Sequence, residues 1–315
     1  MSIEVSRLSK TFHRRFRFGG EVGTQQAVSD ISFTVREGEI AGFLGPNGAG
    51  KSTTMKMITG YLPPTAGTVL VNGKNIAKEP RSAKQSIGYL GEHNPLYLDM
   101  YVHEYLAFAA GLYGLSSTAR RKRVKEMLSL CGLEPEQNKK IGQLSKGYRQ
   151  RIGLAQSLIH DPPVLVLDEP TSGLDPNQLV EMRKLIKSVS ARKTVLFSSH
   201  ILQEVEALCE RVIVIHHGVI VADDRLANMV RGRTEAVVIE FSASVSEGIL
   251  SAAEGVQSVS VAGPNRYRLV ARPGFDIRVS LIRLAAERRL PMVGMVQEEN
   301  SLESVFSQLT TEASS

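Results

Sequence analysis

One glycine-rich turn constrains the fold of this chain more than any other feature. The segment GPNGAGKST, residues 45–53, lies between an apolar run, Glu39–Leu44, and a helix-like stretch, Lys51–Thr59. It matches G-x-x-x-x-G-K-[ST] in the strand-to-helix setting that this phosphate-binding pattern requires. Backbone N–H groups converge on phosphate oxygens where glycine removes the Cβ atom, and the helix start adds positive potential. The residues predicted to contact the phosphates are Gly45, Pro46, Asn47, Gly48, Ala49, Gly50, Lys51, Ser52 and Thr53.

Charged and hydroxyl side chains near this turn predict its chemistry. Lys51 is expected to neutralise the outer phosphates, and Ser52 is expected to ligate Mg²⁺. Further along, the apolar run Val164–Leu167 ends in Asp168 and Glu169. Open α/β sheets bind their ligands at the carboxyl ends of parallel strands. We therefore expect Asp168 to hold Mg²⁺ and Glu169 to polarise the water that attacks the γ-phosphate of a nucleotide.

The chain divides into two parts by pattern and by charge. Strand-like runs alternate with helix-like segments up to about residue 231, which predicts an α/β fold with a parallel sheet. Residues 1–231 carry a net charge of +8 and residues 232–315 one of −2, so the two parts have different surfaces. We predict a nucleotide-binding domain over 1–231 and a small α+β domain over 232–315. The elements expected in the second domain are strands Ala236–Phe241, Val256–Val261, Arg266–Ala271 and Val293–Gln297 and helices Ile277–Arg289 and Leu302–Leu309.

Two short segments add candidate phosphate contacts. LSKGYRQR opens a helix, and the Ser145 hydroxyl and Gly147 amide at its start form an anion site aimed away from the chain's own phosphate turn. A simple helix cap is the alternative interpretation of Ser145. His200 follows the strand-like run Val195–Ser198, which places its imidazole at the same sheet edge as the two carboxylates.

In this order the phosphate turn, LSKGYRQR, VLVLDEP, the following SGLD and SSH resemble the motifs of the nucleotide-binding subunit of an ABC transporter. The resemblance extends over about residues 1–224. It implies a P-loop NTPase cassette of the α/β class, with a RecA-like parallel-sheet core, an antiparallel β subdomain and an α-helical subdomain over about 93–160. The small α+β domain follows this cassette.

The resemblance also implies a functional dimer. Two subunits pair head to tail, and each ATP with its Mg²⁺ lies between the phosphate turn of one subunit and the LSKG segment of the other. Ser145 and Gly147 then touch the γ-phosphate held by the second subunit, and Asp175 bridges the two sites at the seam. His200 contacts the γ-phosphate and the attacking water. Phe12 matches the position that stacks on adenine, and the alternative is an ordinary core residue at a strand end.

Three features depart from the pattern of this family. The usual glutamine after the strand-like run Ser86–Leu90 is Glu92, which can still ligate Mg²⁺ but adds a negative charge beside the phosphates. Lys146 and Tyr148 replace the more common glycine and glutamine of the signature. An insertion, His13–Gln26, is predicted to form a surface hairpin.

Two longer stretches indicate the kind of partner. YLGEHNPLYLDMYVHEYLAFAAGLYGL and ENSLESVFSQLT resemble gliding-motility-associated and multidrug-export ATPase subunits, whose membrane-spanning permease is a separate chain. This resemblance implies a subunit that lies in the cytoplasm on the inner face of the cell membrane. One intact set of motifs permits a homodimer with two equal sites, and a heterodimer with another ATP-binding subunit is the alternative. A multi-span permease is expected to dock near Glu92–Tyr101, and internal packing is the alternative for the apolar residues of Asn94–Tyr101. The chain has no apolar run long enough for a transmembrane helix.

The function, one basic run and one histidine pair each have an alternative interpretation. A soluble cassette ATPase that acts on nucleic acid or ribosomes is the alternative function. Only about 94 residues separate Lys51 from Ser145, without sustained heptads, and the chain holds one cassette, so no nucleic acid is expected. The basic run Arg120–Lys125 is read as a solvated helix face, with anionic lipid or nucleic acid as alternatives. His216-His217 is expected to form a hairpin turn rather than a metal pair.

Overall fold

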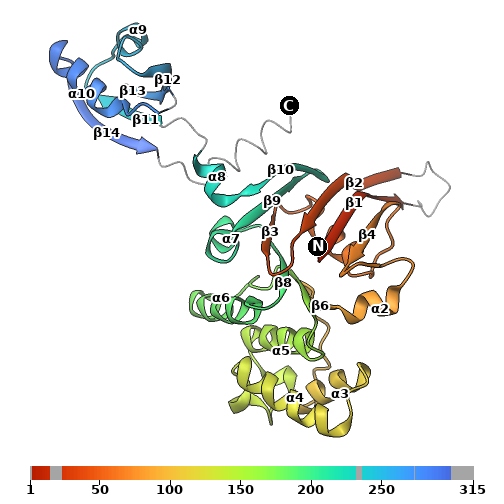
Figure 1. Cartoon of the computed structure of the whole chain (residues 1–315). Coiled ribbons are helices and arrows are strands. Elements are labelled where there is room, and N and C mark those ends of the chain that lie inside the picture. The colour runs from red at the N-terminus through yellow and green to blue at the C-terminus, as the bar shows by residue number, and fades with distance from the viewer. Residues whose placement is uncertain (1, 15–22, 232–235, 273, 299–315) are drawn as a thin grey trace. The chain divides into compact units, whose positions relative to one another are not determined.

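A computed structural model describes residues 2–14, 23–231, 236–272 and 274–298 of the chain (Figure 1). These residues form two compact units, the first ending at Arg225 and the second beginning at Leu226. The division predicted after Arg231 falls at the end of helix α8 (Leu226–Arg231), whose contacts belong to the second unit.

A six-stranded sheet forms the centre of the first unit, in the order β10-β9-β3-β8-β7-β6. The five strands from β9 to β6 are parallel, and β10 pairs with β9 in the antiparallel sense. Every residue of β7 and β8 is buried, because helices and a second sheet, described below, cover the faces of this parallel sheet. The strands are β3 (Ile40–Leu44), β6 (Ile87–Leu90), β7 (Val164–Asp168), β8 (Thr194–Ser199), β9 (Arg211–His216) and β10 (Val219–Arg225).

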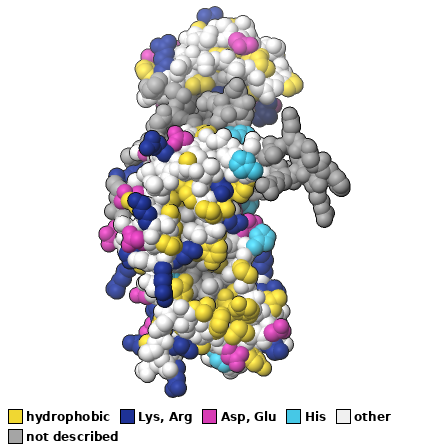
Figure 2. Space-filling view, turned by 90° about the vertical axis from the view of Figure 1, so that its right-hand side faces the viewer, with side chains coloured by type: hydrophobic (Ala, Val, Ile, Leu, Met, Phe, Trp, Pro, Cys, Tyr) yellow, Lys and Arg dark blue, Asp and Glu magenta, His cyan; other side chains and the backbone are white. Residues whose placement is uncertain are grey.

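Helices follow the strands as the alternating sequence pattern predicts. The helical region at about 93–160 contains α3, α4 and α5, which contact one another, and hydrophobic side chains gather on its surface in Figure 2. The helices of the first unit are α1 (Lys51–Ile58), α2 (Pro80–Gln85), α3 (Val102–Leu112), α4 (Ser117–Leu130), α5 (Lys146–Leu158), α6 (Pro176–Ser190) and α7 (Leu202–Leu208). Short 3₁₀ turns lie at Glu134–Glu136 and Ile141–Gln143.

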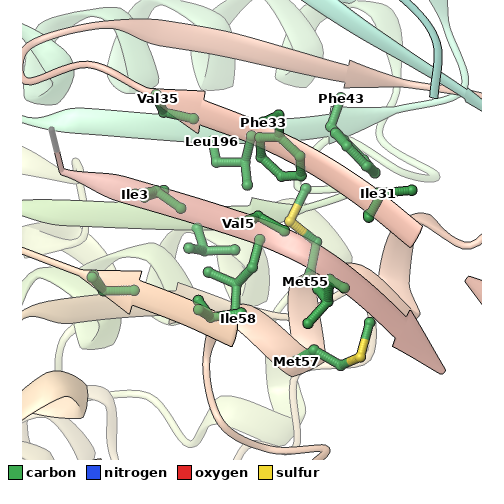
Figure 3. Packing of buried hydrophobic residues seen from close by; sticks show 14 of the residues in the cluster. Ile3, Val5, Ile31, Phe33, Val35, Phe43, Met55, Met57, Ile58 and Leu196 are labelled. Atoms are coloured by element: carbon green, nitrogen blue, oxygen red, sulfur yellow. The ribbon is translucent and has the colours of Figure 1, made fainter. Parts of the chain in front are cut away.

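An antiparallel sheet packs beside the parallel one. Its order is β2-β1-β4-β5, and its apolar face meets α1 and the central sheet in one hydrophobic core that includes Val5, Phe33, Phe43 and Met55 (Figure 3). Because α1 directly follows the phosphate turn, this shared core fixes the position of the turn relative to both sheets. The strands are β1 (Ile3–Arg14), β2 (Gly23–Val35), β4 (Ala66–Val71) and β5 (Lys74–Asn75).

The structure describes the two strand ends of the predicted hairpin at His13–Gln26, up to Arg14 and from Gly23. Strands β1 and β2 pair in the antiparallel sense as far as Arg14 and Gly23, so both strands extend into the insertion. Residues 15–22 lie outside the described part of the chain.

The second unit is a four-stranded antiparallel sheet in the order β12-β13-β11-β14, with α10 packed on one face through Ile277 and Leu281. The predicted strands and helix are therefore present, with ends that differ by a few residues. Residues 299–315, which include the helix predicted at Leu302–Leu309 and most of ENSLESVFSQLT, lie outside the described residues. The elements are β11 (Ala236–Phe241), α9 (Glu247–Leu250), β12 (Val256–Gly263), β13 (Arg266–Ala271), α10 (Ile277–Glu287) and β14 (Met292–Glu298).

Close packing of β6 on α5 gives one stability prediction. A Cβ atom on Gly88 would overlap the carbonyl oxygen of Ser157 and would lie 2.7 Å from Cδ2 of Leu165. We expect Gly88→Ala to lower the free energy of unfolding by about 1–3 kcal/mol, because backbone and core side chains must both shift. Chemical denaturation measures this change. Gly294→Ala is the control, because nothing lies within 4 Å of its Cβ position, and equal effects of the two substitutions would contradict the prediction.

Candidate functional site

The phosphate turn joins β3 to α1 with glycines at its tightest points. Gly50 has φ 108°, a left-handed conformation that side chains resist, and α1 begins at the next residue. A Cβ atom on Gly45 would overlap the carbonyl oxygen of Ile215 on β9. The turn therefore holds its shape through contacts with the neighbouring strand, and it presents the first amides of α1 at the sheet edge, as an anion site requires.

Lys51 is held inside this turn. Its ammonium donates hydrogen bonds to the carbonyl oxygens of Gly45 (2.8 Å) and Pro46 (3.2 Å). Nζ also lies 3.3 Å from Oε1 of Glu169, and the Lys51 side chain is only 5% exposed. A buried ammonium next to a carboxylate keeps its charge in place for phosphate oxygens.

Ser52 and Asp168 lie together, as the sequence predicts. The Ser52 hydroxyl donates to Oδ1 of Asp168 at 3.1 Å, and the Ser198 hydroxyl donates to the same oxygen at 2.7 Å. Burial raises the pKa of Asp168, and the hydrogen bonds from the two serines oppose that shift. A hydroxyl and a carboxylate side by side are the oxygen donors that Mg²⁺ prefers, so these residues fit this ion.

Glu169 connects Lys51 with His200. One carboxylate oxygen, Oε1, faces Lys51, and the other, Oε2, lies 2.8 Å from Nδ1 of His200. The backbone of Glu169 has φ 51°, an unusual conformation for a residue with a side chain, which costs about 1–3 kcal/mol. Its amide donates to the Ser198 hydroxyl at 3.0 Å. The predicted meeting of Glu169 and His200 at one sheet edge is therefore present.

A cavity of about 730 Å³ lies over the phosphate turn. Lys51, Ser52, Glu92, Glu169 and His200 line it, together with other residues of the turn. Phe12, which is 38% exposed, also lines it. Five further lining residues were not among the predicted site residues: Gln25, Gln26, Ala27, Ser172 and His217.

Ser172 belongs to the SGLD segment, and the other four carried no clear signal in the sequence. Gln25 and Gln26 belong to the predicted insertion, and the pairing of Phe12 with Gln25 across β1 and β2 brings them to the cavity. His217 lies in the turn between β9 and β10, as the hairpin interpretation predicts. The amide of the next residue, Gly218, donates to the carbonyl oxygen of Ala49, which holds the turn against the phosphate turn.

Ser145, Gly147 and Asp175 do not line the cavity of their own chain. The Ser145 hydroxyl caps α5 by accepting from the amide of Tyr148, and the Asp175 carboxylate caps α6 by accepting from the amide of Gln178. The side chain of Gln178 packs closely on Gly147: a Cβ atom added to Gly147 would lie 2.6 Å from Cδ of Gln178. The start of α5 therefore lies against α6 at Gln178.

The described residues contain neither a three-residue metal cluster nor a membrane-spanning helix. Within the described ranges, no group of three His, Cys, Asp or Glu residues is placed to hold a metal ion. No helix in that part of the chain is both long and apolar enough to cross a bilayer. Cys131 and Cys209 are buried and free, and burial raises the pKa of the Cys131 thiol to about 12.

Comparisons with known proteins agree with this geometry. The family model for ABC transporters matches residues 28–172. ABC transporter ATP-binding protein NatA of Bacillus subtilis (strain 168) is 38% identical over 74% of this chain and 96% of its own length. Nod factor export ATP-binding protein I of Rhizobium sp. (strain N33) is 34% identical over 98% of this chain and 97% of its own length.

A solved structure shows the same fold. The dimeric post-hydrolysis structure of the ATP-binding cassette MJ0796, bound to ADP and Pi, has 26% identity and a TM-score of 0.63. The match covers 71% of this chain and 98% of that one. Family match, near-complete coverage of the relatives and the arrangement of Lys51, Asp168 and Glu169 lead to one conclusion: the chain belongs to the ATP-binding subunits of ABC transporters and is an ATPase.

Proposed function

We propose that two copies of this chain pair head to tail and hydrolyse two ATP molecules at their seam. The observation that carries the proposal is the separation of the predicted phosphate contacts. Lys51, Glu169 and His200 line the cavity, whereas Ser145 and Gly147 lie outside its lining. A second copy would supply the missing signature contacts to the γ-phosphate. The solved cassette is dimeric, which supports the pairing of two copies.

The predicted site residues then have distinct roles in hydrolysis. Lys51 and the amides of the phosphate turn bind the phosphates, and Phe12 stacks on adenine. Glu169 accepts a hydrogen bond from the attacking water, and His200 holds the Glu169 carboxylate and contacts the γ-phosphate. Asp175 bridges the seam between the two copies. ATP binding closes the dimer because each nucleotide touches both chains, and hydrolysis removes these contacts.

Ser52, Asp168 and Glu92 are the residues that would hold Mg²⁺. The ion supplies positive charge to the phosphate oxygens when it is bound. Glu92 lines the cavity and its side chain is 43% exposed, with its Oε2 3.9 Å from Nδ1 of His93. In place of the usual glutamine, its carboxylate adds an anionic oxygen to this donor set.

Glu92→Gln tests this assignment. We expect the Mg²⁺ concentration that gives half-maximal ATPase rate to rise by roughly two- to fivefold, because one partly exposed negative charge is lost near the ion. Titrating the ATPase rate with Mg²⁺ at saturating ATP measures the change. Glu206→Gln, an exposed residue on α7, is the control. An unchanged Mg²⁺ dependence in Glu92→Gln would remove Glu92 from the metal site.

The surface near Glu92–Tyr101 is the proposed docking site for a separate permease. Two of its apolar residues are largely exposed: Tyr97 is 59% and Leu98 48% exposed. A cavity of about 430 Å³ beside them is lined by Glu92, Leu98 and the signature residue Lys146, among others. An apolar helix of the permease would fill such a groove, next to residues that contact nucleotide.

Recovery of the permease tests this part of the proposal. Where the neighbouring reading frame encodes a polytopic membrane protein, that protein, co-expressed with this chain, should co-purify with the wild type. We expect Leu98→Asp to lower its recovery by about tenfold or more, because a charge is placed in an apolar contact. Leu130→Asp is the matched control, since Leu130 is 43% exposed on α4. Equal recovery with Leu98→Asp would move the docking site elsewhere.

We further propose that the complex exports its substrate and lies on the inner face of the cytoplasmic membrane. The sequence resemblance to gliding-motility-associated and multidrug-export subunits supports this direction, as does the similarity to a Nod factor export protein. The domain at 232–315 is proposed as an accessory unit to the cassette at 1–231. Truncation after Arg231, followed by transport and ATPase assays, tests whether that unit is needed.

A further inference from the structure

A buried carboxylate joins two loops behind the site. Glu204 lies in the first turn of α7 and is 1% exposed. Its Oε2 accepts a hydrogen bond from the Thr171 hydroxyl at 2.6 Å and another from the Ser199 hydroxyl at 2.7 Å. Both partners are buried as well, at 3% and 0% exposure. One oxygen atom therefore connects the loop after β7 to the end of β8.

These two hydroxyls belong to the loops that carry the catalytic side chains. Thr171 follows Glu169 by two residues, and Ser199 directly precedes His200. On the cavity side, Glu169 and His200 contact each other at 2.8 Å. Backbone and side-chain links therefore close a ring, in which Glu204 joins the loops on one side and the Glu169–His200 contact joins them on the other.

A role in core packing alone does not account for a carboxylate at this position. Among the described residues, no cation forms an ion pair with Glu204, and its second oxygen, Oε1, is buried without a hydrogen-bond partner. Burying a carboxylate in this way is unfavourable, and an apolar side chain of similar volume would fill the space with less loss of stability. What an apolar side chain lacks is an acceptor for both hydroxyls.

We propose that Glu204 is a positioning residue that sets the distance between Glu169 and His200. The inference rests on the proposed function, since it assumes that these two side chains act on the attacking water and the γ-phosphate. Glu169 keeps an unfavourable backbone conformation, φ 51°, and such conformations persist only where the surroundings hold them. Anchoring Thr171 through Glu204 supplies part of that restraint. It also connects the seam residue Asp175, further along the same loop, to the position of His200.

Substitutions of Glu204 test this role. We expect Glu204→Met to lower kcat by about 10- to 100-fold, with KM for ATP within about twofold of wild type, because a small displacement of reacting groups slows chemistry without removing binding contacts. Glu204→Gln keeps an acceptor oxygen and should return kcat to within about threefold of wild type. Glu206→Gln is the control, since Glu206 lies two residues away on α7 and is exposed.

The single-hydroxyl variants Thr171→Val and Ser199→Ala keep the proposal testable if Glu204→Met folds poorly. Each should lower kcat by about three- to tenfold, since each removes one of the two anchors. A loss of kcat in Glu204→Gln equal to that in Glu204→Met would overturn the anchoring role, as would wild-type kcat in both hydroxyl variants.

A double-mutant cycle separates positioning from general stability. If Glu204 acts through His200 and Glu169, Glu204→Met should slow single-turnover hydrolysis by less than about twofold when His200 is already alanine. A role in folding alone would give the same factor in both backgrounds and would overturn the proposal. Glu169→Gln tells failure of the positioning role from failure of the proposed function. Wild-type hydrolysis in Glu169→Gln would refute the function itself. Slow hydrolysis in Glu169→Gln, together with equal slowing by Glu204→Met in the wild-type and His200→Ala backgrounds, would refute only the positioning role.

Discussion

Glu169→Gln is expected to slow ATP hydrolysis by about 10²–10⁴-fold and to leave ATP bound in a closed dimer. The amide cannot polarise the attacking water as a carboxylate does, whereas the phosphate turn, Lys51 and Ser52 are unchanged. Because Oε1 of Glu169 lies 3.3 Å from Lys51 and Oε2 lies 2.8 Å from His200, the neutral amide keeps the size of the side chain at the centre of these contacts. Hydrolysis and binding should therefore separate in this variant.

Size-exclusion chromatography with and without Mg²⁺-ATP, together with the steady-state ATPase rate, measures both effects. The same substitution at Glu206, an exposed residue outside the site, should behave as wild type. Loss of ATP binding in Glu169→Gln would contradict its role as the base. A variant that stays monomeric with saturating ATP, alone and with its permease, would contradict the proposed head-to-tail dimer.

Lys51→Ala is expected to abolish measurable hydrolysis and to weaken ATP binding by on the order of 10²-fold or more. The substitution removes the positive charge inside the phosphate turn and leaves the buried Glu169 carboxylate without its cation, which is among the larger penalties in a protein interior. Both consequences act on the nucleotide, because an unpaired carboxylate also repels the γ-phosphate. Binding and hydrolysis should thus be lost together, in contrast to Glu169→Gln.

Fluorescent-nucleotide titration and the ATPase rate measure these losses. Lys184→Ala on α6 removes an exposed lysine outside the cavity and should leave both quantities unchanged. Turnover at the wild-type rate in Lys51→Ala would refute the role of the phosphate turn. Circular dichroism of both variants checks that the fold is retained.

The catalytic side chains of the cassette were predictable because their signals are local. Lys51 and Ser52 lie within one nine-residue pattern, and Asp168 and Glu169 follow a run of apolar residues that reads as a buried strand. The ends of parallel strands meet at one sheet edge, so the sequence also predicts that His200 lies beside Glu169. The observed contact at 2.8 Å agrees with this expectation.

The difference in burial between Glu204 and Glu206 on α7 could not be predicted from the sequence. Glu204 and Glu206 lie two residues apart in the stretch QEVEAL and read alike as acidic residues of an amphipathic helix. Only the packing of α7 against β3 and β8 makes Glu204 buried and leaves Glu206 exposed. The hydroxyl partners of Glu204 come from two other loops, and no spacing rule connects them.

By itself, therefore, the sequence determined the α/β cassette, the alternation of its elements and the residues expected to meet phosphate and water. Each of these depends on neighbours along the chain or on the regular geometry of parallel strands. The tertiary structure alone decided that Gln25 and His217 line the cavity and that Glu204 joins the loop after β7 to the end of β8. Such contacts bring together residues far apart in sequence, and their free energy depends on burial and distance, which only the folded chain defines.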